Sequence, residues 1–297
     1  MRSRRWSGLW VVVVWAVAVT MAAGACGGDG PAGSRAGGGA VLRISGSTTV
    51  NAVAADAAET LRGRGLQITV DSQGGSAGGI AQLGAGQVEI AMSSKPIGDD
   101  DRRMFPSVRF VPHQIGADAL GVIVRREVVD GGLRGLTRDQ ARRLFEGRIT
   151  NWRELGGPDL PVFVYDKEPG RGTREVLDKY LYGDATPPPP PDSDNFAIVG
   201  GNEETRAKLL STEGSVGPLS TSFITGHPQL AALALDGIEA TPANVTSGTY
   251  PMARPLFLLT DGDPTGAAKQ FVDFVLSAPG QALVTKHGFL TVAELRL

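Results

Sequence analysis

The chain has 297 residues, of which 41% are hydrophobic and 20% are charged, and its formal net charge at pH 7 is −2. These values are ordinary for a globular protein with one large domain or two medium ones. They argue against a nucleic-acid partner, because there is no excess of basic residues and no pattern of interleaved basic and aromatic residues.

The first segment, residues 1–25, has the pattern of a secretory signal peptide. Arginines precede an apolar run from Leu9 to Ala23, which is short for a membrane span. Cys26 is the only cysteine, and the Ala-Gly-Ala before it resembles the lipobox of bacterial lipoproteins, whose cysteine carries a diacylglycerol after cleavage. We therefore expect a lipidated Cys26, a flexible tether over residues 26–40 and an extracytoplasmic protein anchored to the bacterial cell membrane.

Three predicted strands in succession, at residues 41–45, 66–70 and 88–94, end in segments rich in serine or glycine. The first two loops lead into segments whose apolar residues recur at helical spacing. Such alternation predicts an α/β sheet, and ligands of these sheets bind beyond the carboxyl ends of the strands. The loops bring hydroxyl groups to that edge, from Ser47, Thr48, Ser76, Ser93 and Ser94.

The second half of the chain continues the same alternation. Residues 119–126 read as a strand, and residues 136–147 read as a helix with a capping box formed by Thr137 and Gln140. Five consecutive prolines exclude a helix or a central strand at residues 186–192. The remaining predicted elements are a strand at 162–167, a helix at 203–212, a strand-turn unit at 214–220, a strand at 254–260 and a final helix broken near Pro279.

The segment from Glu168 to Leu181 places glycines on both sides of Arg171 and then opens an apparent helix with Thr173 and Arg174. Glycine lets backbone amides approach a ligand closely, and the start of a helix attracts anions. The segment therefore predicts a cradle for a small oxyanion. The alternative is an ordinary loop with a helix cap at Thr173.

An enzymatic alternative rests on the sequence Gly-Gly-Ser-Ala-Gly at residues 74–78, which fits the nucleophile elbow of serine hydrolases. It is disfavoured because no HGG-type oxyanion segment is present and no histidine lies near a recognisable acid partner. The three histidines also lack the spacing of metal ligands. We expect no catalytic residue, no metal and no cofactor.

Segments over nearly the whole mature chain resemble the phosphate-binding lipoproteins of bacterial ABC importers. They include ISGSTTV (44–50), SQGGSAGG (72–79), AMSSKPI (91–97), LFEGRITNWRELGG (144–157), EPGRGTREVL (168–177), GSVGPLS (214–220) and SGTYPMARPLFLLT (247–260). The resemblance implies a non-enzymatic subunit that captures inorganic phosphate between two lobes and presents it to the permease subunits of an ABC importer. The same fold binding another oxyanion such as sulfate, or acting as a sensor, stays open.

The fold that the resemblance implies is α/β, of the type II periplasmic-binding-protein kind. Two α/β lobes would be joined by two crossing strands, near residues 119–124 and 250–257. The first lobe would comprise residues 41–122 and 246–297, and the second lobe residues 123–245.

Several site residues follow from the resemblance. Ser47 and Thr48 match the family's first binding loop, and Ser76 matches the second. Gly172, Thr173 and Arg174 match its Gly-Ser-Gly-Thr-Arg loop, in which Arg171 replaces the usual serine. Arg171 either turns to solvent or enters the site, and we expect Arg174 to be the main charged ligand.

A second departure concerns the proton that phosphate keeps at pH 7. Some relatives accept this proton with an aspartate in the third loop, where this chain has Ser94. Asp118 is the nearest substitute that the sequence offers, and its alternative role is a structural carboxylate near the hinge.

Overall fold

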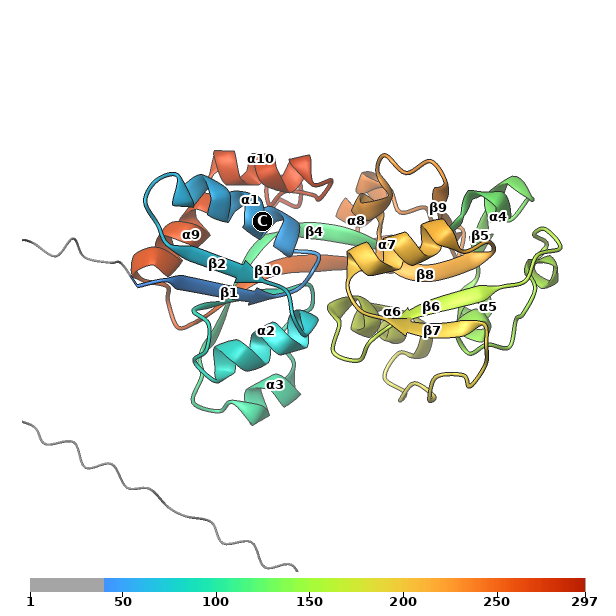
Figure 1. Cartoon of the computed structure of the whole chain (residues 1–297), viewed down its shortest axis with the longest axis horizontal. Helices are drawn as coiled ribbons and strands as arrows, with labels where there is room; N and C mark the ends of the chain where they lie inside the picture. Colours follow the sequence, from blue (N-terminus) through green and yellow to red (C-terminus); the bar gives the residue numbers. More distant parts are fainter. Residues whose placement is uncertain (1–39, 297) are drawn as a thin grey trace, which may run out of the picture. The chain divides into compact units, whose positions relative to one another are not determined.

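The computed structural model describes residues 40–296 (Figure 1). The predicted signal peptide and Cys26 lie outside the described residues. Within the described range, no helix is long and apolar enough to cross a membrane.

The first lobe is built on a mixed sheet with the strand order β2-β1-β3-β10-β4. The strands β1, β2 and β3 run parallel, and β10 pairs antiparallel with both β3 and β4. The strands are β1 (Leu42–Gly46), β2 (Ile68–Asp71), β3 (Ile90–Ser93), β4 (Phe110–Arg125) and β10 (Ala253–Asp261). The helices are α1 (Asn51–Arg62), α2 (Gly75–Gly84), α3 (Asp99–Met104), α9 (Gly266–Leu276) and α10 (Ala278–Lys286).

The second lobe continues from the far half of β4, which pairs antiparallel with β8 and β9. Strand β6 runs parallel to β8 and β7, and β5 runs parallel to β9. The strands are β5 (Gly135–Leu136), β6 (Phe163–Lys167), β7 (Phe196–Val199), β8 (Ser215–Ser220) and β9 (Leu230–Leu235). The helices are α4 (Arg126–Asp130), α5 (Arg138–Phe145), α6 (Gly172–Tyr182), α7 (Asn202–Ser211) and α8 (Pro242–Thr246), with short 3₁₀ turns at Trp152–Leu155 and Thr221–Ile224.

Two chain segments cross between the lobes (Figure 1). Residues 110–119 of β4 pair with β10, and residues 120–124 pair with β8, so this single strand belongs to both sheets. The second crossing leads into β10, and the Tyr250 hydroxyl donates a hydrogen bond of 2.8 Å to the Leu120 carbonyl beside it. The predicted α/β fold, with two lobes joined by two crossing strands, is confirmed.

Each lobe has its own hydrophobic core. The first core contains Ile44, Met92 and Phe271, all fully buried. The second core is built around Trp152. The indole N–H of Trp152 donates a hydrogen bond of 2.8 Å to the Gly214 carbonyl, which satisfies the one polar group of this buried side chain. The lobe boundaries after residues 122 and 245 stay a prediction.

The predicted elements are mostly present, with differences at their ends. The capping box of α5 is formed, since the Thr137 side chain accepts from the Gln140 backbone N–H. Helix α6 begins at Gly172 and has Arg171 as its N-cap, so Thr173 lies inside the first turn and does not cap the helix. The elements β5, β7, β9, α3, α4 and α8 carried no sequence prediction.

Candidate anion-binding site

A small polar cavity, with a volume of about 10 Å³, lies between the lobes. Loops at the carboxyl ends of β1, β2 and β3 line it from the first lobe, and loops after β6 and β7 line it from the second. The lining residues are Ser47, Thr48, Thr49, Gly75, Ser76, Ser94, Lys167, Arg171, Gly172, Thr173, Gly200 and Asn202.

Four helices begin at this cavity. Helices α1 and α2 start there from the first lobe, and α6 and α7 start there from the second. The first N–H groups of a helix have no partner within the helix and form the positive end of its dipole. Two helices from each lobe therefore direct positive potential at one small volume, which favours an anion.

The serine hydroxyls at the cavity are arranged to donate. The Ser47 Oγ accepts the backbone N–H of Thr49 at 3.2 Å, and the Ser76 Oγ accepts that of Ser94 at 3.1 Å. An oxygen that already accepts a hydrogen bond keeps its own hydrogen for another partner. Ser47 and Ser76 can thus donate into the cavity.

Two threonine hydroxyls are oriented by a buried arginine that sequence reasoning missed. The Arg254 guanidinium donates to Thr173 Oγ1 at 2.8 Å and to Thr49 Oγ1 at 3.0 Å. Because a guanidinium can only donate, both hydroxyls must accept from it and can direct their hydrogens elsewhere. Arg254 thereby prepares one donor from each lobe. A lone charged residue within the apolar strand 254–260 was the available signal.

Asp118 neutralises that arginine and does not line the cavity. Its Oδ2 accepts from Arg254 at 2.7 and 2.9 Å, and its Oδ1 accepts from the Ser220 hydroxyl at 2.6 Å. The side chains of Asp118 and Arg254 are each 1% exposed. Both carboxylate oxygens are thus engaged, which matches a structural carboxylate near the hinge and leaves the acceptor role proposed for Asp118 without geometric support.

Arg171 lies at the cavity. Its Nε and Nη2 donate to Glu168 Oε2 at 3.0 and 2.6 Å, while its buried Nη1 has no hydrogen-bond partner among the described residues. Glycines make room for the side chain: a Cβ on Gly75 would lie 2.7 Å from the Arg171 Cδ. Since a buried unpaired donor of a charged group is costly, Nη1 is a position for an anionic acceptor.

Arg174, by contrast, is not brought to the cavity. Its Nε lies 2.8 Å from both carboxylate oxygens of Asp178, and its Nη1 lies 2.6 Å from Asp166 Oδ2. Burial raises the pKa of Asp166 to about 6, and the neighbouring Arg174 opposes this shift. The direction of the first helical turn points Arg174 at these carboxylates, whereas sequence position suggested that it faced the anion.

Of the remaining predicted site residues, some line the cavity and one does not. Thr48, Ser94 and Gly172 line the cavity, and a Cβ on Gly172 would lie 2.5 Å from Ser94 Oγ, so only glycine fits there. Ser93 does not line it, because its hydroxyl donates to the Lys95 carbonyl at 2.7 Å. The structure thus brings together all the predicted residues except Ser93, Asp118 and Arg174.

Lys167 is a further cation at the cavity that sequence reasoning missed. Its ammonium group donates to the carbonyls of Gly200 and Gly201, at 3.2 and 3.0 Å, and to the Thr205 hydroxyl. Burial, together with the nearby charges of Arg171 and Arg254, lowers the pKa of Lys167 to about 7. An anion in the cavity would favour the protonated form of this lysine.

Several bonds across the cavity hold the lobes together. The Ala77 backbone N–H donates to the Gly170 carbonyl at 3.1 Å, and Lys95 Nζ lies 3.0 Å from Glu175 Oε1. In addition, the Asn202 amide nitrogen donates to Thr49 Oγ1 at 2.9 Å. These contacts bridge the lobes where most of the cavity's lining side chains are buried, and a less hydrated site strengthens every charge–dipole interaction within it.

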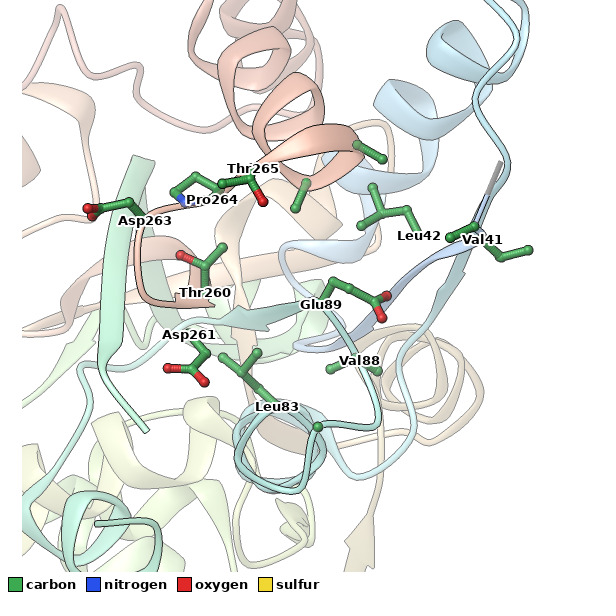
Figure 2. Close-up of a pocket in the computed structure, with 14 residues that line it drawn as sticks. Val41, Leu42, Leu83, Val88, Glu89, Thr260, Asp261, Asp263, Pro264 and Thr265 are labelled. Atoms are coloured by element: carbon green, nitrogen blue, oxygen red, sulfur yellow. The ribbon is translucent and has the colours of Figure 1, made fainter. Parts of the chain in front are cut away.

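A second, larger pocket in the first lobe has the opposite electrostatic character. It has a volume of about 440 Å³, and Figure 2 shows the carboxylates of Glu89, Asp261 and Asp263 among its lining residues. None of the described residues that line it is a lysine, arginine or histidine. Glu89 is paired with Arg43 and Asp263 with Arg109, but both arginines lie outside the lining. The pocket wall therefore offers carboxylates and no cationic donor, so this pocket does not compete as an oxyanion site.

The polar side chains that line the small cavity are chiefly hydrogen-bond donors. Its lining residues include neither a carboxylate nor a histidine, so Ser76 has no such base beside it. Among residues 40–296, no group of three or more histidine, cysteine, aspartate or glutamate side chains is placed to hold a metal. The geometry defines a two-lobed protein that binds a small anion through neutral and cationic donors.

Comparison with known proteins agrees with this class. Residues 33–279 match the PBP superfamily domain, and the chain belongs to that superfamily. A phosphate-binding protein PstS of Bacillus subtilis is 28% identical over 258 residues, which cover 86% of this chain and 82% of that protein.

Solved structures give the same result. One is a putative phosphate ABC transporter substrate-binding protein of Clostridium perfringens with bound phosphate, at 28% identity and a TM-score of 0.74, covering 85% of this chain and all of that one. An ABC-type phosphate transport receptor of Vibrio cholerae, at 24% identity and a TM-score of 0.67, shares the fold over 84% of this chain and 99% of its own. These two structures are described as a substrate-binding protein and a receptor of phosphate transporters, and this chain is not an enzyme.

The buried pair of Asp118 and Arg254 yields a test of stability. Asp118→Ala leaves a buried guanidinium without its counter-charge and should cost about 3–5 kcal/mol in the free energy of unfolding, measured by urea denaturation. Asp118→Ala combined with Arg254→Met removes both charges and should cost less than the single substitution. Asp273→Ala, which breaks an exposed pair with Lys269, is the control and should cost under about 1 kcal/mol. Equal losses for Asp118→Ala and Asp273→Ala would contradict the assignment.

Lys167 yields a test by pH. The unfolded chain holds its lysine protons up to the ordinary pKa of 10.5, whereas the folded protein releases this proton near pH 7. Between these values the unfolded state binds more protons, so the lysine's contribution to stability rises with pH, by up to about 1.4 kcal/mol per pH unit. The unfolding free energy of the native protein minus that of Lys167→Met should increase from pH 7 to pH 9 in phosphate-free buffer. A constant difference would show that the lysine stays protonated in the folded state.

Proposed function

We propose that the protein binds inorganic phosphate between its lobes and delivers it to the permease subunits of an ABC importer. The observation that carries this proposal is the donor-rich cavity, at which four helix N-termini, oriented hydroxyls and the unpaired Nη1 of Arg171 meet. This constellation suits a small, multiply charged oxyanion stripped of water.

The choice of phosphate draws on the relatives. The Bacillus subtilis protein is described as phosphate-binding, and the Clostridium perfringens structure contains bound phosphate. Both match this chain over most of their length, which supports the same ligand class here. Sulfate remains the competing oxyanion, and calorimetric titration of the ligand-free protein with phosphate, sulfate and molybdate separates the alternatives. Tighter binding of sulfate or molybdate than of phosphate would contradict the proposal.

We assign the main charged contact to Arg171 rather than to Arg174. Arg171 Nη1 is buried at the cavity, and Glu168 neutralises only the other side of the guanidinium. Arg174 has its Nε on Asp178 and its Nη1 on Asp166, outside the cavity lining. An arginine thus takes the place of the family's usual serine and supplies a charge-assisted hydrogen bond in its stead.

A pair of matched substitutions tests this assignment. Arg171→Met should weaken phosphate binding about ten- to a hundredfold, because a hydrogen bond to a charged group contributes about 1.5–3 kcal/mol. Arg174→Met should lower the melting temperature by leaving Asp166 and Asp178 unpaired, and it should change the phosphate dissociation constant by less than Arg171→Met does. Calorimetric titration gives the affinities, and thermal unfolding of the ligand-free proteins gives the stabilities. Loss of binding in Arg174→Met with intact binding in Arg171→Met would reverse the roles.

We also propose a location for the protein, from its N-terminal sequence. The apolar run, the lipobox-like Ala-Gly-Ala-Cys and the glycine-rich stretch after Cys26 support a lipoprotein on the outer face of the cell membrane. Such an anchor would keep the binding protein close to its permease, with the tether allowing the domain to move between partners.

Anchoring is tested by cell fractionation. Cys26→Ala should move the protein from the membrane fraction to the soluble fraction or the medium, because stable attachment needs the acyl chains that lipoprotein processing adds to the cysteine. Ser34→Ala, a change in the same glycine-rich stretch, is the control and should leave the protein in the membrane fraction. Membrane attachment unchanged by Cys26→Ala would refute lipidation at this residue.

A further inference from the structure

Asn202 is the cavity residue whose chemistry the oxyanion site described so far does not use. It is the first residue of α7, is 1% exposed and lines the cavity. Its amide nitrogen donates to Thr49 Oγ1 at 2.9 Å, whereas its carbonyl oxygen Oδ1 is buried and has no hydrogen-bond partner among the described residues. A buried acceptor left without a donor is costly, so Oδ1 calls for a donor at this position.

The surroundings of Oδ1 make this acceptor unusual. The guanidinium of Arg171 and the ammonium of Lys167 can only donate, and the hydroxyls of Ser47 and Ser76 already accept backbone N–H groups. A fully deprotonated oxyanion such as sulfate has only acceptors and would face Oδ1 with repulsion. A phosphate that retains a P–OH group would instead bring a donor of its own to Oδ1.

We infer that Asn202 Oδ1 accepts the hydrogen of protonated phosphate and thereby selects phosphate over sulfate. The inference rests on the proposed phosphate-binding function. Asn202 would supply the acceptor that the third loop lacks, where Ser94 stands, and that Asp118 cannot supply while Arg254 and Ser220 engage its two oxygens.

The hydrogen bond to Thr49 fixes the amide plane and thus the position of Oδ1. Thr49 also accepts from Arg254, at 3.0 Å, so the selecting oxygen is held by the same buried arginine that orients Thr173. The reversed amide would turn its nitrogen toward the cavity and would make Asn202 a donor to any oxyanion. The two orientations predict opposite effects of an aspartate.

The test compares Asn202→Asp with Asn202→Leu in the full mature protein, by calorimetric titration with inorganic phosphate at pH 7.5. Aspartate keeps an acceptor oxygen, and leucine has a similar size without one. An accepting role predicts that Asn202→Leu weakens phosphate binding at least tenfold and that Asn202→Asp binds phosphate more tightly than Asn202→Leu. If Asn202→Asp binds phosphate no better than Asn202→Leu, or if Asn202→Leu binds like the native protein, the inference is overturned.

Sulfate titrations add a second readout. Asn202→Asp should bind sulfate less tightly relative to phosphate than the native protein does, and a loss of both anions in equal measure would overturn the inference. This arm decides the question even if Asn202→Leu fails to fold, which thermal unfolding of the ligand-free variants reports. A native protein that does not bind phosphate would refute the proposed function itself, whereas the inference alone fails if the native protein binds phosphate and Asn202→Asp does not favour it.

Discussion

The buried ion pair between Arg254 and Asp118 is the interaction on which the rest of the site depends. Both residues lie on the crossing strands, opposite each other in the register of β4 and β10. The guanidinium contacts Thr49 of the first lobe and Thr173 of the second at once. One side chain at the junction therefore links the position of both lobes to the orientation of the hydroxyls that face the cavity.

This arrangement explains how a chain with an acidic formal charge builds an anion site. The charge of Arg254 is neutralised by Asp118, so its main effect on the cavity is directional, because it forces threonine oxygens to accept. Helix N-termini and backbone amides then provide positive potential without net charge. Of the cationic side chains that line the cavity, Arg171 has a buried donor without a partner among the described residues, and Glu168 balances its other face. Local dipoles thus decide the preference of the site, and the net charge of the whole protein matters little.

The sequence predicted the fold and most of the loops well, because both depend on local patterns. Strands followed by Ser/Gly-rich loops predicted which residues meet at the sheet edge, and Ser47, Ser76 and Thr173 do line the cavity. Side-chain direction was not predictable in this way. Arg174 was expected at the anion. It is instead held by two carboxylates, Asp166 in β6 and Asp178 in α6. Arg254 and Asn202 were missed because their roles arise from contacts that span 81 to 205 positions of the chain.

The two departures from the family pattern have one physical consequence in common. Replacing a serine by Arg171 adds positive charge to the cavity, which strengthens the binding of any oxyanion and reduces discrimination among them. Discrimination must then come from an element that penalises the wrong anion. A buried carbonyl oxygen such as Asn202 Oδ1 does this without adding negative charge, whereas a carboxylate would cancel part of the attraction that Arg171 supplies. An extra cation and a neutral acceptor are therefore mutually consistent in one small cavity.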